Sequence, residues 1–122
     1  MDSQPMTKAT IYHNPRCSKS RQALALLEEA GCDITVVEYL KTPPSASLLS
    51  DLLAALGIEA NTLIRAKDAE FKALGLDAKT LDEKATIALL AETPKLIERP
   101  IVVVGKKAVV ARPPERVSEL LS

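Results

Sequence analysis

The chain has 122 residues, of which 47% are hydrophobic and 26% charged, and its 16 basic residues balance 16 acidic ones. This size and composition predict one globular domain over residues 1–122 and argue against a disordered chain. The zero net charge gives no support to non-specific nucleic-acid binding, and no apolar run reaches the length that would span a membrane. The first eight residues lack the apolar centre of a signal peptide, so we expect a cytoplasmic protein.

The first third of the chain predicts a strand, a helix and a second strand. Residues 8–12 are β-type, and residues 17–30 carry apolar side chains at helical spacing, with Gly31 as a candidate C-cap. Residues 34–40 are again rich in β-branched side chains. This order is a βαβ unit, in which the two strands are parallel and the crossover is right-handed.

The middle of the chain predicts a helical insertion over about residues 45–93. Ser45 is a candidate N-cap for a helix over residues 46–56, and Gly57 ends that helix. The pattern then stays helical with interruptions, so the insertion is not a repeat.

Two further helix starts are expected inside this insertion. Asn61 is a candidate cap for a short helix that carries Ile64 and Arg65, and Thr80 is a candidate cap for a helix over roughly residues 81–92.

The last part of the chain predicts a β-hairpin over residues 101–110, with Gly105 in the first position of a two-residue turn, and then a short helix. The order βαβ, helical insertion, ββα predicts an α/β fold with a thioredoxin-like mixed four-stranded sheet. In this architecture the third strand runs antiparallel to the first, so Arg99 and Pro100 are expected beside the end of the first strand. We expect the bond before Pro100 to be cis.

Cys17 is the candidate catalytic nucleophile. Asn14-Pro15 is a turn dipeptide, so the helix is expected to start just after Pro15 with Cys17 in its first turn. Free helical N–H groups and the helix dipole favour a thiolate there. A free cysteine is more often a small buried hydrophobe, but here the neighbours are polar and basic. No acidic residue occurs from Ser3 to Leu27.

Ser20 occupies the position where a dithiol motif would have its second cysteine, so dithiol exchange within this loop is excluded. Its hydroxyl is expected either to hydrogen-bond the thiolate or to cap the helix. Cys32 follows the helix, and about thirteen helical residues separate it from Cys17 by about 20 Å. A disulfide needs Cα atoms within about 7 Å, so the reductant is expected to come from outside the chain. With one histidine and no Cys-x-x-Cys spacing, the sequence predicts no metal site.

The hairpin register suggests an oxyanion site. A turn at Gly105-Lys106 places Arg99 opposite Arg112, which is unfavourable unless an anion lies between the two guanidinium groups. The alternative is that both arginines are solvated surface charges.

Four motifs, in this order, resemble the glutaredoxin-coupled arsenate reductase family of the ArsC type: Tyr12-His-Asn-Pro-x-Cys-x-x-Ser-Arg21, Leu63-Ile-Arg65, Glu98-Arg-Pro-Ile-Val-Val103 and Ala111-Arg-Pro113. The resemblance implies a thioredoxin-like fold with a helical insert, which agrees with the prediction above. It implies that Cys17 forms a covalent adduct with arsenate and that Arg65, Arg99 and Arg112 bind the oxyanion. It also implies that His13 helps to hold the thiol in its reactive state.

The same resemblance implies glutathione as a co-substrate and glutaredoxin as a protein partner, with no bound cofactor. A rival function is that of a redox-sensing or RNA polymerase-binding adaptor without turnover; such relatives typically carry Cys-x-x-Cys and lack the full arginine set, so Ser20 and Arg65 favour the enzyme. A third reading is a thiol transferase or a reductase of another oxyanion. No apolar stripe beyond the needs of the core is evident, so a monomer is expected.

Overall fold

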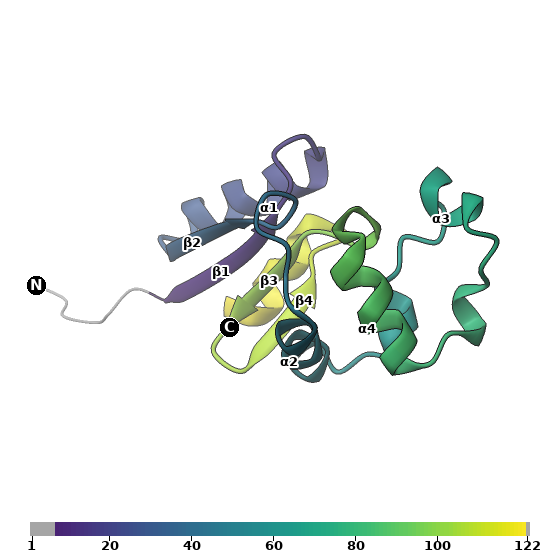
Figure 1. The fold of residues 1–122 in the computed structure, drawn as a ribbon. Helices are drawn as coiled ribbons and strands as arrows, with labels where there is room; N and C mark the ends of the chain where they lie inside the picture. The colour runs from purple at the N-terminus through teal and green to yellow at the C-terminus, as the bar shows by residue number, and fades with distance from the viewer. Residues whose placement is uncertain (1–6, 122) are drawn as a thin grey trace, which may run out of the picture. The chain divides into compact units, whose positions relative to one another are not determined.

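The computed structural model describes residues 7–121; residues 1–6, on which the expected absence of a signal peptide partly rests, lie outside the described residues. The chain forms two compact units (Figure 1). One unit holds the residues before Tyr39 together with those from Arg99 onward, and the other is Tyr39–Glu98. The expectation of a single domain with a helical insertion over about residues 45–93 stays a prediction.

A mixed four-stranded sheet is the centre of the first unit. Its strands are β1 (Lys8–His13), β2 (Asp33–Glu38), β3 (Ile101–Val104) and β4 (Lys107–Val110). They lie in the order β2-β1-β3-β4, as Figure 1 shows. Strands β1 and β2 are parallel and are joined by α1 (Ser18–Glu29), whereas β3 is antiparallel to both β1 and β4. The predicted thioredoxin-like α/β sheet is therefore confirmed.

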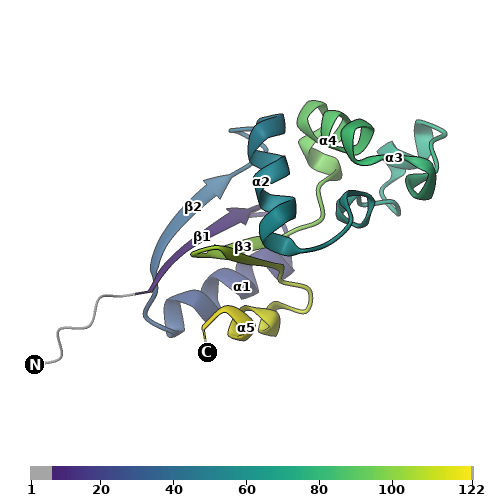
Figure 2. The ribbon, with the colours of Figure 1, turned by 90° about the horizontal axis from the view of Figure 1, so that it is seen from below.

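One face of this sheet is covered by α1 and by the C-terminal segment, which consists of the 3-10 turn η4 (Pro114–Val117) and α5 (Ser118–Leu121) (Figure 2). Side chains alternate between the two faces along a strand, and Ile11 of β1 points to this face, where it is buried with Leu27 of α1. His13 lies two residues after Ile11 in the same strand, so its side chain points to the same face, toward α1. It lies at the carboxyl end of β1, where the loop to α1 begins.

The hairpin has the predicted register. Ile101 pairs with Val110 and Val104 pairs with Lys107, and Gly105 takes a φ of 61° that favours glycine. The peptide bond between Arg99 and Pro100 is cis, as expected.

The second unit is built from short helices. They are α2 (Ala46–Leu56), α3 (Ala69–Ala73) and α4 (Glu83–Glu92), together with the 3-10 turns η1 (Ala60–Leu63), η2 (Ala78–Thr80) and η3 (Pro94–Leu96). The first of these helices is as predicted, because Ser45 caps α2 through a hydrogen bond from the Leu48 N–H and Gly57 ends it with a φ of 66°. Among residues 7–121, no helix is long and apolar enough to span a membrane.

Two predicted helix starts in this unit are wrong. Asn61 lies inside η1, which begins after Glu59, and the chain beyond it is extended: Ile64 forms a β-bridge with Ile97. A helix there is replaced by main-chain pairing, since the Arg65 N–H donates to the Leu96 carbonyl at 2.7 Å.

The start of α4 is also displaced from the predicted one. Thr80 is the last residue of η2, and its hydroxyl donates to the Asp77 carbonyl. Asp82 is the N-cap of α4 instead, because its carboxylate accepts the Ala85 N–H at 2.7 Å.

Candidate functional site

The loop between β1 and α1 places Cys17 at the N-cap of α1. The Cys17 main chain is extended, with φ −94° and ψ 121°, so the helix begins at Ser18, one residue later than predicted. The turn is closed by the Cys17 N–H, which donates to the Asn14 carbonyl at 2.9 Å. The Asn14 side chain also closes it, because its Oδ1 accepts the Arg16 N–H at 3.0 Å. This Asx turn was not predicted, although the Asn-Pro pair signalled a turn.

The electrostatic environment lowers the pKa of the Cys17 thiol. Burial of the sulfur acts to raise the pKa and is the largest single influence, but hydrogen bonding from the Ser20 N–H, the Arg99 guanidinium and the Lys19 N–H together outweighs it. An N-cap side chain faces the second and third N–H groups of its helix, which here belong to Lys19 and Ser20. The sulfur therefore lies where helices usually have a Ser or Asp oxygen, although it completes no capping hydrogen bond of full geometry.

The Ser20 hydroxyl ties this loop to the end of β1. It lies 2.6 Å from His13 Nδ1 and accepts the Asn14 N–H at 3.1 Å, and all three residues are buried. Burial lowers the pKa of His13; the Glu38 carboxylate opposes this effect and the Arg21 guanidinium adds to it. A neutral imidazole at pH 7 follows. The Ser20 hydroxyl was expected to bond the thiolate or to cap the helix, and it does neither. It bonds His13 and Asn14 instead, and the main-chain N–H of Ser20 acts on the sulfur.

Arg99 and Arg112 lie next to each other at the open end of the hairpin. Arg112 Nη1 donates to the Arg99 carbonyl at 3.1 Å, as the predicted register suggests. Ile101 pairs with Tyr12 near the end of β1, and Arg99 precedes it by two residues. The Arg99 guanidinium thereby reaches the Cys17 sulfur, on which it acts both as a hydrogen-bond donor and as a positive charge.

Arg65 belongs to the other unit. Its guanidinium pairs with Asp68 at 3.4 Å and with Glu98 at 3.6 Å, and its side chain is 25% exposed. The bridge between Ile64 and Ile97 fixes its main chain. Sequence spacing alone gave no reason to single out Arg65; only the resemblance did.

Cys32 is buried and follows the far end of α1, and burial raises the pKa of its thiol. Both cysteines are free. The two thiols thus differ in environment as the sequence suggests, with Cys17 partly exposed and held toward its ionised form.

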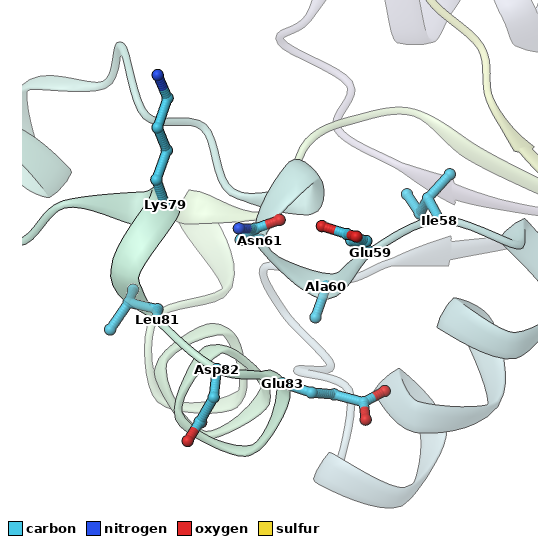
Figure 3. Close-up of a pocket in the computed structure, with 8 residues that line it drawn as sticks. All are labelled: Ile58, Glu59, Ala60, Asn61, Lys79, Leu81, Asp82 and Glu83. Atoms are coloured by element: carbon cyan, nitrogen blue, oxygen red, sulfur yellow. The ribbon is translucent and has the colours of Figure 1, made fainter.

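A hollow of about 450 Å³ lies within the second unit (Figure 3). Its lining is Ile58, Glu59, Ala60, Asn61, Lys79, Leu81, Asp82 and Glu83. None of the predicted site residues lines it. Three carboxylates against one ammonium group would repel an oxyanion, so the hollow does not compete with Cys17 as the candidate oxyanion site.

Comparison with protein families gives one match over most of the chain. The model of the ArsC family matches residues 12–120. A Neisseria meningitidis protein named arsenate reductase is 49% identical over 117 residues, which cover 95% of this chain and 100% of that protein. An Escherichia coli protein named only as the uncharacterized protein YfgD is 51% identical over 118 residues, covering 95% of this chain and 99% of that protein.

Solved structures agree with this result. An arsenate reductase from Vibrio cholerae superposes with a TM-score of 0.90 at 46% identity, covering 95% of this chain and 99% of that one. A putative arsenate reductase from Yersinia pestis gives 0.85 at 52% identity, over 91% and 98% of the two chains.

Proposed function

The chain belongs to the ArsC family, and from this premise we propose that it is an arsenate reductase that uses Cys17 as its nucleophile. The observation that carries the proposal is the Cys17 sulfur at the N-cap of α1, where helix N–H groups and Arg99 lower the pKa of the thiol. A thiolate beside a guanidinium group is suited to attack an oxyanion, because the cation offsets the repulsion between two negative charges.

The first step is attack of the Cys17 thiolate on arsenic. An As–S bond forms, one As–O bond breaks, and the oxygen leaves as water after taking up protons from solvent. Arg99 and Arg112 are proposed to bind the remaining arsenate oxygens, since Arg99 acts on the sulfur and Arg112 is hydrogen-bonded to the Arg99 carbonyl. The family resemblance assigns the same task to Arg65. His13, neutral and held by Ser20, is proposed to keep the loop in the conformation that ionises the thiol.

Reduction then needs two electrons from external thiols, because Cys32 lies beyond the far end of α1. Glutathione adds to the arsenic, and a second As–O bond breaks to release water. A glutaredoxin thiol attacks the glutathione sulfur, so that an S–S bond forms, the As–S bond to glutathione breaks and the electron pair stays on arsenic. The As(III) on Cys17 is hydrolysed to arsenite and the free thiol. Glutathione and glutaredoxin are the proposed partners. Because these reductants belong to the cytoplasm, we propose a cytoplasmic location. The proposal also keeps the expectation of a monomer.

The test is arsenate-dependent NADPH oxidation in the presence of glutathione, glutaredoxin and glutathione reductase. Cys17→Ser is expected to abolish the activity, because an alcohol at this position is not ionised near neutral pH. Cys32→Ser is the matched control and is expected to retain most of it. Equal loss in the two variants would refute an external-thiol mechanism, and no activity in the wild-type chain would refute arsenate reduction.

A further inference from the structure

We propose that Arg16 and Lys19 form a cationic rim beside Cys17 that receives the carboxylate groups of an anionic small thiol. This inference rests on the proposed arsenate reductase function and assigns the residues that select the thiol co-substrate. The class of co-substrate is a thiol that carries net negative charge on carboxylates, as glutathione does, in preference to a neutral thiol of similar reactivity.

The basic side chains of this segment do not all have the same surroundings. Arg21 is used within the fold, because its Nη1 donates to the Pro15 carbonyl at 2.7 Å and so fastens the loop to α1. Arg16 and Lys19 are exposed, and within residues 7–121 neither side chain has a hydrogen-bond or ion-pair partner. Their charges are therefore not needed to hold the loop together.

The position of these two cations relates them to the sulfur. Arg16 directly precedes Cys17, and Lys19 is the second residue of α1, whose N–H acts on the sulfur. The segment from Ser3 to Leu27 contains no acidic residue. Arg99, by contrast, is only partly exposed and acts directly on the sulfur. The cationic side chain that acts on the sulfur thus comes from the segment just before β3, whereas Arg16 and Lys19 are exposed to solvent.

A thiol that attacks the arseno-adduct must arrive from solvent, and Arg16 and Lys19 are exposed cations on the loop and first turn of α1 that carry Cys17. As it arrives, an S–As bond forms and an As–O bond breaks, with the oxygen leaving as water. Fixed positive charge near a reacting site raises the local concentration and the association rate of an anion and leaves a neutral molecule unaffected. The rim is therefore expected to accelerate this step more for thiols that carry additional carboxylate charge than for thiols that do not.

The experiment measures thiol attack on Cys17 without arsenate. In a Cys32→Ser background, Cys17 is converted to its mixed disulfide with 2-thiopyridine. An incoming thiolate attacks the Cys17 sulfur, a new S–S bond forms, and the released 2-thiopyridone is followed by its absorbance. The readout is the ratio of the rate constants for glutathione and for 2-mercaptoethanol, each corrected for its thiolate fraction. Because the assay contains no arsenate, this ratio can be measured even if the protein does not reduce arsenate, so failure of the rim is distinguished from failure of the proposed function.

The test variant is R16Q/K19Q, and the matched control is K106Q/K107Q, which removes the same charge at the hairpin turn, the end of β3 away from Arg99. At low ionic strength the ratio is expected to fall by about five-fold in R16Q/K19Q and to stay unchanged in the control. High salt should lower the ratio of the parent protein to that of R16Q/K19Q. An unchanged ratio in R16Q/K19Q, or an equal fall in K106Q/K107Q, would overturn the proposal.

Should the Cys32→Ser background fail to fold, alkylation of the natural chain gives the same information. The rate ratio of iodoacetate to iodoacetamide at Cys17, assigned by mass spectrometry, compares an anion with its neutral analogue on one thiolate. Any change in the thiol pKa cancels in this ratio. The same about five-fold fall is expected in R16Q/K19Q alone, and equal ratios in all three proteins would refute the rim.

Discussion

At the scale of single residues, Cys17 shows how a fold lowers the pKa of a thiol through a helix N-terminus and a guanidinium group. The sulfur takes the N-cap position and Arg99 supplies a donor and a charge. We expect Arg99→Gln to raise the pKa of Cys17, since the thiolate loses its stabilising cation while the burial that opposes ionisation stays. The pH midpoint of iodoacetamide alkylation should move upward by about one unit.

The control for this prediction is Lys106→Gln, which removes a charge at the hairpin turn and should leave the midpoint of the alkylation profile in place. A profile of Arg99→Gln identical to that of the wild type would show that the helix N–H groups alone set the pKa of the thiol.

Two residue-scale predictions from the sequence agree with the structure. The polar, basic neighbours of Cys17 predicted a thiol held toward its ionised form, and the hairpin register predicted that Arg99 lies near Arg112. That Cys17 is the nucleophile stays a prediction. The partners of Ser20 were not found. A hydroxyl can donate to or accept from many groups. The Ser20 hydroxyl bonds His13 and Asn14 because of where β1 ends relative to α1, and this position cannot be deduced from the spacing of residues along the chain.

At the scale of elements, the start of α4 provides a direct comparison between the predicted cap and the observed one. Asp82→Ala is expected to lower the free energy of unfolding by about 1 kcal/mol, because the Ala85 N–H loses its side-chain acceptor. Thr80→Ala should cost only a few tenths of that amount, since its hydroxyl is exposed and bonds η2 rather than α4. Urea unfolding of both variants measures the difference, and a larger cost for Thr80→Ala would contradict the observed cap.

Element boundaries were predicted best where two signals agree. For α2, Ser45 at one end and Gly57 at the other bracket a continuous apolar pattern, and the observed bounds match. Between Glu59 and Asp82 several residues are able to cap, and main-chain pairing of Ile64 with Ile97 overrides local preference. That pairing joins segments more than thirty residues apart in sequence, so no local pattern signals it.

At the scale of the whole molecule, His13 makes stability depend on pH. The pKa of His13 is lowered in the folded chain by burial, with Glu38 opposing and Arg21 adding to the effect, whereas the unfolded chain has a histidine pKa of about 6.5. The unfolded state therefore takes up a proton first as the pH falls. Stability is full above pH 6.5 and declines below it, by up to about 1.4 kcal/mol per pH unit, until the folded histidine also titrates.

His13 is the single histidine of the chain, so no other imidazole titrates between pH 7 and 6. His13→Gln keeps a polar partner for Ser20 and removes the titration. Urea midpoints between pH 7.5 and 5.5 should fall for the wild type and change much less for His13→Gln. Parallel curves for the two proteins would show that the imidazole does not titrate differently on folding.

The arrangement of the sheet was predictable because βαβ and ββ connections admit few topologies. The division of the chain into two compact units at Tyr39 and Arg99 was not predictable from the sequence, because no Gly-rich or Ser-rich linker marks either point.

Helix α1, twelve residues long, separates the only two sulfur atoms of the chain that can form a disulfide. Cys17 therefore cannot form a disulfide within its own molecule. A disulfide at Cys17 joins it to some other compound or polypeptide, and its return to the free thiol requires a thiol from outside the chain. A gel run without reductant would show this as added mass rather than as a more compact band.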